Sequence, residues 1–231
     1  MTPPLAIARP EGWIYRVARA PDPWRWPDWN YAHEDGTFGS RFDDPRGEYR
    51  VLYASSRREG AFAETLSRFR VDLHVAAEQQ AIDGDPEDAG YPEPLAGGVV
   101  PIEWTETRLL GTARHPGGFV DLAHSDSLAH LRAELADRVL HHGLDDLDAG
   151  DVRRRAPRQL TQEISRYLFE HGRDDHGAAV AGVRYLSRLG DELVNWAIFE
   201  ANEPSDATSE PIEPDDEALR LVFERFDLTW G

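Results

Sequence analysis

The sequence of 231 residues predicts one α+β domain built on a mixed or antiparallel β-sheet. A strand pattern over residues 48–55 runs directly into a helix pattern over residues 56–69. Two more strand patterns follow late in the chain, over residues 179–185 and 192–199. The sequence contains no G-x-G-x-x-G phosphate loop, and this absence argues against a doubly wound parallel sheet.

The N-terminal part of the chain contains a further strand and two irregular stretches. Aromatic and β-branched side chains predict the strand within residues 11–20. Proline recurs every few residues in the stretch 21–31, which excludes a regular helix there. Residues 36–47 (GTFGSRFDDPRG) have the composition of a turn-rich loop, and this loop leads into the strand at 48–55.

The first helix is predicted over residues 56–69. Ser56 and Glu59 have the S-x-x-E spacing of a capping box, which marks a helix start. The apolar stripe of this helix consists of Phe62, Leu66 and Phe69. A helical wheel places Glu64 nearly opposite the stripe, so periodicity alone assigns Glu64 to a solvated face.

Apolar residues at helical spacing predict three later helices, over residues 127–142, 157–171 and 215–226. Acidic runs rich in proline and glycine indicate solvated loops, at residues 83–93, 145–151 and 202–217. We expect one domain over residues 1–200, with an insertion at about 71–104. Residues 201–231 would add an acidic linker and a C-terminal helix packed on the same domain.

The composition excludes several classes of chemistry. The chain has no cysteine, which removes disulfides, thiolate nucleophiles and cysteine zinc sites. All 25 basic residues are arginine, so lysine-dependent phosphate loops and Schiff bases are excluded as well. The formal charge of −18 would repel a nucleic-acid backbone, and we expect no direct binding of DNA or RNA.

Common catalytic, metal and membrane signatures are also absent from the sequence. There is no H-E-x-x-H and no G-x-S-x-G motif, and the histidines have no metal-ligand spacing, so we expect no metal site. No apolar run reaches the roughly 18 residues of a membrane span, and the first 20 residues do not resemble a signal peptide. The expected location is the cytoplasm, without a membrane contact.

Five residues whose side chains could bind or act on a ligand are spread along the chain: Arg16, Arg41, Tyr53, Glu64 and Ser187. Taken singly, each has an ordinary structural explanation, such as a surface charge, a core aromatic or a turn residue. We expect these side chains to converge on one cleft.

The stretch GSRFDDPRGEYRVLYASSRREGAFAETL, followed downstream by QLTQEISRYLFEHG and GVRYLSR, resembles the RES-domain family, which is named for its Arg, Glu and Ser. The resemblance covers roughly residues 11–70 and 105–200. It implies a fold similar to that of ADP-ribosyltransferase toxins, with a split β-sheet core, helices around an NAD-binding cleft, and breakdown of NAD as the activity. Members of the family include toxins of bacterial toxin–antitoxin pairs.

The resemblance carries the family's site onto five positions of this chain. The family's strand arginine corresponds to Arg16, and the arginine of its G-S-R motif corresponds to Arg41. Its strand-end tyrosine corresponds to Tyr53, its helix glutamate to Glu64, and its late serine to Ser187. This implies catalytic roles for Glu64, Tyr53, Arg41 and Ser187, and NAD binding by Arg16, Arg41, Tyr53 and Ser187. NAD would be the substrate, with no further cofactor.

The residue types suit this chemistry. Breaking the bond between nicotinamide and ribose develops positive charge on the sugar, while nicotinamide leaves as a neutral molecule that needs no proton. One carboxylate, Glu64, would then suffice to stabilise the charged sugar. Arg16 and Arg41 could hold the pyrophosphate, Tyr53 could pack against the nicotinamide ring, and Ser187 could donate a hydroxyl group.

The sequence does not decide whether water or inorganic phosphate accepts the ADP-ribose group. Other functions are also compatible with it. Transfer of ADP-ribose to a macromolecule, and a non-catalytic interaction protein with an inherited cleft, are the main alternatives. A serine hydrolase is a more distant one, because Ser187 has no recognisable nucleophile motif. The resemblance implies a helix-turn-helix antitoxin or a second copy of the chain as partner.

Overall fold

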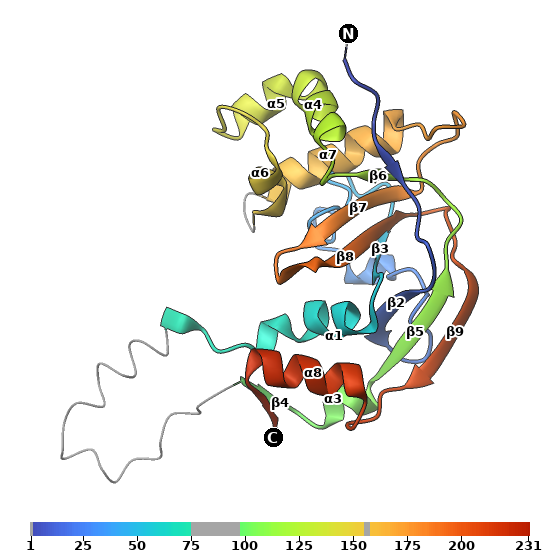
Figure 1. Cartoon of the computed structure of the whole chain (residues 1–231), viewed down its shortest axis with the longest axis vertical. Helices are drawn as coiled ribbons and strands as arrows, with labels where there is room; N and C mark the ends of the chain where they lie inside the picture. Colours follow the sequence, from blue (N-terminus) through green and yellow to red (C-terminus); the bar gives the residue numbers. More distant parts are fainter. Residues whose placement is uncertain (1, 75–97, 155–157) are drawn as a thin grey trace, which may run out of the picture.

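A computed structural model of the protein describes residues 2–74, 98–154 and 158–231. In these residues the chain forms an eight-stranded mixed sheet and a separate pair of parallel strands, with helices packed on the large sheet (Figure 1). The order of the large sheet is β1-β6-β7-β8-β3-β2-β5-β9, and only β6 and β7 pair in parallel within it. The predicted α+β class with a mixed sheet is therefore confirmed.

The strands are β1 (Ile7–Ala8), β2 (Ile14–Arg19), β3 (Val51–Ser55), β4 (Gly98–Val100), β5 (Arg108–Arg114), β6 (Phe119–Asp121), β7 (Gly182–Ser187), β8 (Gly190–Phe199), β9 (Ser205–Pro211) and β10 (Leu228–Trp230). The helices are α1 (Arg58–Leu66), α3 (Glu103–Glu106), α4 (Ser125–Glu134), α5 (Ala136–His141), α6 (Ala149–Arg153), α7 (Arg158–His171) and α8 (Glu217–Phe226). Short 3-10 turns occur at Trp29–Tyr31 and Ser67–Phe69.

The large sheet splits between β3 and β2. β2 pairs with β5 over its whole length, from Ile14 to Arg19, but it pairs with β3 only where Tyr15 faces Ser55. Beyond this point the two strands separate, so the edge of β3 that faces β2 lacks a strand partner there. The split sheet that the family resemblance implied is present.

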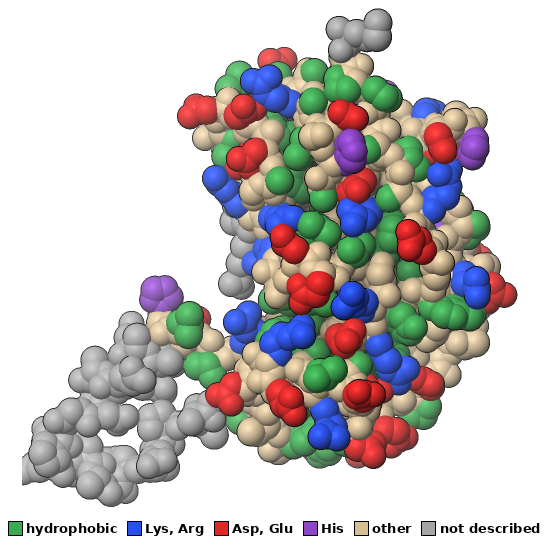
Figure 2. Space-filling model, viewed as in Figure 1, with side chains coloured by type: hydrophobic (Ala, Val, Ile, Leu, Met, Phe, Trp, Pro, Cys, Tyr) green, Lys and Arg blue, Asp and Glu red, His purple; other side chains and the backbone are tan. Residues whose placement is uncertain are grey.

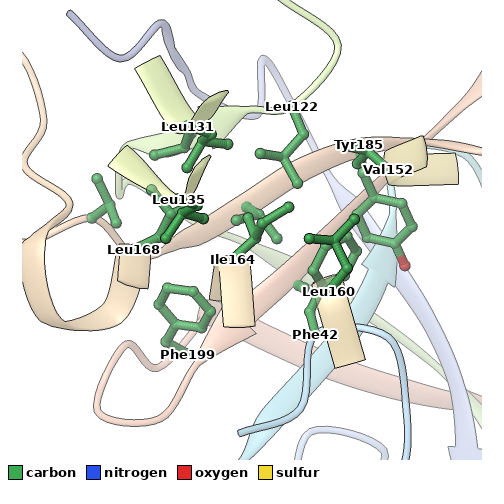
Figure 3. Close-up of a cluster of buried hydrophobic side chains, with 14 of the residues drawn as sticks. Phe42, Leu122, Leu131, Leu135, Val152, Leu160, Ile164, Leu168, Tyr185 and Phe199 are labelled. Carbon is green, nitrogen blue, oxygen red and sulfur yellow. The ribbon is translucent and has the colours of Figure 1, made fainter. Parts of the chain in front are cut away.

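Helices cover one face of each half of the split sheet. α7, together with α4 and α5, packs on β6, β7 and β8 around fully buried residues such as Leu131, Ile164 and Phe199 (Figure 3). α1 and α8 pack on each other and on the half that contains β2 and β5, around Phe62, Leu110 and other buried side chains. The opposite face of the sheet is covered largely by the tryptophan-rich stretch that follows β2.

That stretch reaches the sheet because one strand residue has no side chain. Trp24 is 8% exposed and lies over Gly111 of β5. A Cβ atom at Gly111 would come within 2.6 Å of the Trp24 indole nitrogen, so a larger residue would push the tryptophan away. The indole N–H donates to the carbonyl of Thr208 in β9 at 3.3 Å, which ties the loop to the edge strand.

Two predicted helices need correction. The capping box at Ser56 is wrong, because α1 begins at Arg58 and its N-cap Arg57 makes no side-chain cap bond. The Ser56 hydroxyl instead accepts the indole N–H of Trp196 at 2.8 Å, since a buried N–H needs an acceptor. The predicted helix 127–142 is two helices, α4 and α5, which meet at Leu135, where the backbone leaves the helical region and the side chain enters the core.

Two of the predicted acidic loops also contain regular structure. Residues 202–217 include β9, which pairs with β5 although all its residues are exposed. Residues 145–151 contain the start of α6, where Asp148 and Asp151 form a capping box. Most of the predicted insertion at 71–104, and the acidic run at 83–93, lie outside the described residues.

Candidate active site

A cleft of about 370 Å³ opens at the split in the sheet. Its walls come from the ends of β2, β3, β7 and β8, from α1, and from the loop that contains Ser40 and Arg41. Four of the five predicted site residues line it, namely Arg16, Arg41, Tyr53 and Glu64. The fifth, Ser187, lies directly behind Glu64 and is 2% exposed. The fold therefore brings together side chains that are far apart in the sequence.

Glu64 is the acidic residue of the cleft. It lies on the exposed side of α1, as the helical wheel indicates, but this side forms a wall of the cleft. Its oxygen Oε1 accepts two hydrogen bonds of 2.6 Å, one from the Ser187 hydroxyl and one from the Asn195 amide. Within the described residues, Oε2 has no hydrogen-bond donor. One carboxylate oxygen is thus held by the protein while the other is available to a ligand.

The Ser187 hydroxyl is oriented by its own backbone surroundings. The backbone N–H of Leu189 donates to Ser187 Oγ at 3.0 Å. With this lone pair occupied, the hydroxyl hydrogen points to Glu64. Ser187 therefore acts on the carboxylate in this structure.

Arg16 bridges the split between β2 and β3. Its guanidinium donates to the backbone carbonyl of Tyr53 in β3 at 2.8 Å. This carbonyl lies where β2 and β3 no longer pair, so the arginine takes the place of a partner in the sheet. It also donates to the carbonyl of Pro23 at 2.8 Å. Burial lowers the pKa of Arg16 to about 10, so the side chain stays charged at neutral pH although its charge is poorly solvated.

Arg41 lies against aromatic rings at the other side of the cleft. Its guanidinium carbon is 5.2 Å from the ring centres of both Phe42 and Tyr185, and it donates to the carbonyl of Val152. Its buried Nε has no partner in the described part of the chain. Burial lowers the pKa of Arg41, and the nearby Arg188 adds to this effect.

Tyr53 uses its hydroxyl to hold the loop that carries Arg41. The hydroxyl donates to Asp43 Oδ1 at 2.7 Å and accepts the backbone N–H of Phe42 at 3.0 Å. The other oxygen of Asp43 accepts the backbone N–H of Ser40 at 2.6 Å. Burial raises the pKa of the Tyr53 hydroxyl well above its usual range, and Asp43 raises it further. The hydroxyl is fully engaged by the protein, so only the ring remains available to a ligand.

Helix α7 also holds the loop that carries Arg41, through Ser165 and Arg166. The Ser165 hydroxyl donates to the carbonyl of Phe42 at 2.6 Å. Arg166 forms an ion pair with the buried Asp44 at 3.2 Å, and its other partners include Glu48 at 2.6 Å. The downstream sequence block QEISR therefore holds the G-S-R loop in position from the protein interior.

Besides Arg158 and Arg188, two further side chains of the site were not among the predicted residues. Tyr185 lines the cleft, and its hydroxyl has no hydrogen-bond partner in the described ranges. Figure 3 shows this hydroxyl pointing away from the labelled core side chains. Burial raises the pKa of Tyr185, and the nearby Glu64 raises it further. Asn195, the other residue, is 1% exposed and donates to Glu64.

A sequence signal for both residues exists. Side chains two apart on a strand share a face, so the prediction of Ser187 places Tyr185 on the same side of β7. Asn195 interrupts the apolar run of β8, where a lone amide needs a hydrogen-bond partner.

The cleft carries a surplus of positive charge. Its four arginines are Arg16, Arg41, Arg158 and Arg188, and Glu64 is the one acidic residue of its lining. Within the described residues, none of the four forms an ion pair with a carboxylate, whereas twelve other arginines do. Acidic and arginine side chains are intermixed over the outer face in Figure 2. The cleft is therefore suited to a small anion.

In the described ranges, no cluster of three or more histidine, aspartate or glutamate side chains is arranged to hold a metal ion. None of the helices described combines the length and the apolar character that crossing a membrane requires.

Comparison with known proteins places the chain in a family. No curated protein matches the sequence. The crystal structure of the M. tuberculosis MbcT–MbcA toxin–antitoxin complex contains a chain that is similar in structure, with a TM-score of 0.47, 13% sequence identity, and coverage of 96% of this chain and 92% of that one. The RES domain model matches residues 14–224, and the chain therefore belongs to the RES-domain family.

Proposed function

We propose that this RES-domain protein cleaves NAD at the bond between nicotinamide and ribose. The bond from the ribose C1′ to the pyridinium nitrogen breaks, and its electron pair returns to the nitrogen, so nicotinamide leaves as a neutral molecule. The C1′ carbon then forms a bond with an oxygen of water or of inorganic phosphate. When water is the acceptor, it loses a proton as the product forms.

The free Oε2 of Glu64 at a cleft with four arginines is the observation that carries this proposal. Positive charge develops on the ribose as nicotinamide departs, and a fixed carboxylate beside the sugar stabilises that charge more in the transition state than in the ground state. Ser187 and Asn195 hold the carboxylate at one oxygen, so it need not reorganise during the reaction.

The arginines would bind the pyrophosphate. Arg16 and Arg41 are desolvated without a carboxylate partner in the described ranges, so a bound phosphate would supply the counter-charge that the protein does not. Their guanidinium groups can each present two N–H donors to phosphate oxygens. The rings of Tyr53 and Tyr185 offer apolar surface for the nicotinamide between these charged groups.

The biological role that we propose is that of the toxin in a toxin–antitoxin pair, as in other members of the family. The proposed partners are a cognate helix-turn-helix antitoxin and a second copy of the chain, with which it would form a homodimer. Because the chain carries a charge of −18, a partner segment rich in arginine or lysine would bind it in a salt-sensitive manner. Co-purification from the native host, followed by size-exclusion chromatography at two salt concentrations, tests these partners.

The function is tested by incubating the protein with NAD, with and without inorganic phosphate, and identifying the products. Free nicotinamide with ADP-ribose indicates a glycohydrolase, and free nicotinamide with a phosphorylated ADP-ribose indicates a phosphorylase. Transfer of radiolabel from phosphate-labelled NAD to a protein or nucleic acid of a host lysate would instead indicate transfer of ADP-ribose. Absence of nicotinamide release in all arms would favour a non-catalytic interaction protein.

A further inference from the structure

Asn195 occupies a position where an apolar residue would be expected. It lies in β8 between β3 and β7, pairs with Ser55 and Tyr185, and is 1% exposed. The side chains at the next two positions on the same face, Ala197 and Phe199, are fully buried. An amide in such a place loses its hydration and has to recover it through hydrogen bonds.

The Asn195 side chain recovers only part of this loss. Its Nδ2 donates to Glu64 Oε1 at 2.6 Å, while its buried Oδ1 has no partner in the described part of the chain. An apolar side chain of the same size would leave no oxygen unpaired, so packing does not explain the amide. The single bond that it makes is directed at the carboxylate of the cleft.

Glu64 needs such a bond because of where it lies. It projects from the exposed side of α1, and its three side-chain torsions would otherwise let the carboxylate turn toward open solvent. Ser187 and Asn195 approach the same oxygen from neighbouring strands of the sheet, which are rigid relative to a helix surface. Arg41 and Tyr185 also face this carboxylate, but neither donates a hydrogen bond to it in the described ranges.

We propose that Asn195 is a positioning residue for Glu64, which together with Ser187 fixes Oε1 so that Oε2 faces the cleft. The kinetic consequences rest on the proposed cleavage of NAD, whereas the effect on the carboxylate does not. Two substitutions separate the contributions. Asn195→Leu removes the donor while keeping the number and branching of the side-chain heavy atoms, and Asn195→Asp keeps the shape but replaces the donor with a second carboxylate.

The matched control is Thr105→Val, which removes a buried hydroxyl bond in α3, outside the cleft. We expect Asn195→Leu to lower kcat about tenfold to a hundredfold, as for other residues that orient a catalytic group, with KM changed less than about threefold. Asn195→Asp should lower kcat at least as far, because it places a second carboxylate against Glu64. The melting temperature of Asn195→Leu should equal or exceed that of the wild type.

The carboxylate is followed directly by 13C NMR, with the Glu64 signal assigned by its absence in Glu64→Gln. At neutral pH we expect the chemical shift of this signal to change in both Asn195 variants, which lose the hydrogen bond to Oε1, and to be the same in the wild type and in Thr105→Val. If NAD is not cleaved at all, the proposed function fails and the NMR spectrum still decides the role of Asn195. An unchanged carboxyl shift, or a kcat of Asn195→Leu within twofold of the control, would overturn the proposal.

Discussion

Replacing Glu64 with glutamine is the most informative single perturbation of the cleft. The carbonyl oxygen of the new side chain can still accept the hydrogen bonds that Ser187 and Asn195 donate to Oε1 in the wild type. The amide NH2 group then takes the place of Oε2, the oxygen without a donor in the described ranges. The substitution therefore keeps the shape and the two anchoring bonds while it removes the negative charge that faces the cleft.

The magnitude follows from the interaction that is lost. Two unit charges about 4 Å apart interact by about 4 kcal/mol at the effective dielectric constant of about 20 that suits sites near a protein surface. That energy corresponds to roughly a thousandfold in rate. The charge on the ribose is largest in the transition state, so we expect the loss in kcat. KM should change less than about threefold, because the arginines that we propose to bind the phosphates are untouched.

The assay is nicotinamide release measured by chromatography over a range of NAD concentrations, with NAD binding measured separately by calorimetry. Glu59→Gln is the matched control, since it removes the same charge from the same helix at a residue that does not line the cleft. A Glu64→Gln variant with kcat within threefold of Glu59→Gln would refute the assigned role of the carboxylate. Equal losses in both variants would instead point to the helix as a whole.

Three further predictions concern side chains of the cleft and a buried histidine outside it. Tyr53→Phe should lower the free energy of unfolding in urea by about 1–3 kcal/mol, because the buried Asp43 loses a hydrogen-bond donor. Tyr185→Phe should leave the stability unchanged and raise KM for NAD. Arg188→Gln should raise KM about tenfold with little change in kcat, since it removes an exposed binding charge. Burial lowers the pKa of His115, so protonation favours the unfolded chain, and stability should fall as pH drops below about 6.5. His115→Gln should reduce this pH dependence in thermal unfolding between about pH 7 and pH 5, and the exposed His176→Gln should not.

The central strands β3 and β8 could be predicted from the sequence, whereas β5, β6 and β9 could not. β3 and β8 carry clear patterns because both are central in the sheet and bury most of their side chains. β9 has the sequence SDATSEP and exposes every residue. It is a strand because its backbone pairs with β5, and this pairing is a tertiary contact that hydropathy does not encode.

Helix starts and helix continuity were predicted wrongly where a side chain makes a tertiary contact instead of the local one. Ser56 has the right spacing for a capping box, but its hydroxyl accepts the indole N–H of Trp196, which is 140 positions away. The break at Leu135 has a similar origin, because the chain gives up helical geometry to place this leucine in the core beneath α7. In both cases the energy gained by burial exceeds that of the local motif.

Periodicity assigned Glu64 to a solvated face, and family resemblance assigned it to a cleft. The structure reconciles the two, because the exposed side of α1 is also a wall of the cleft. No local pattern could show this, because the side chains that hold the Glu64 carboxylate, Ser187 and Asn195, follow it by 123 and 131 positions. For Tyr53, which was assigned both a catalytic and an NAD-binding role, the structure adds a contact within the protein, because its hydroxyl donates to Asp43.

The charge distribution supports a small anionic ligand on physical grounds that are independent of the family. The chain has 43 acidic residues against 25 arginines, so an arginine at a random surface position would readily find a carboxylate. In the described ranges, the four arginines of the cleft nevertheless form no ion pair with one, and two of them are desolvated. Such an arrangement costs stability unless a ligand supplies the counter-charge. A polyanion would be repelled by the surrounding acidic surface, whereas a dinucleotide is small enough to bring its phosphates to the cleft alone.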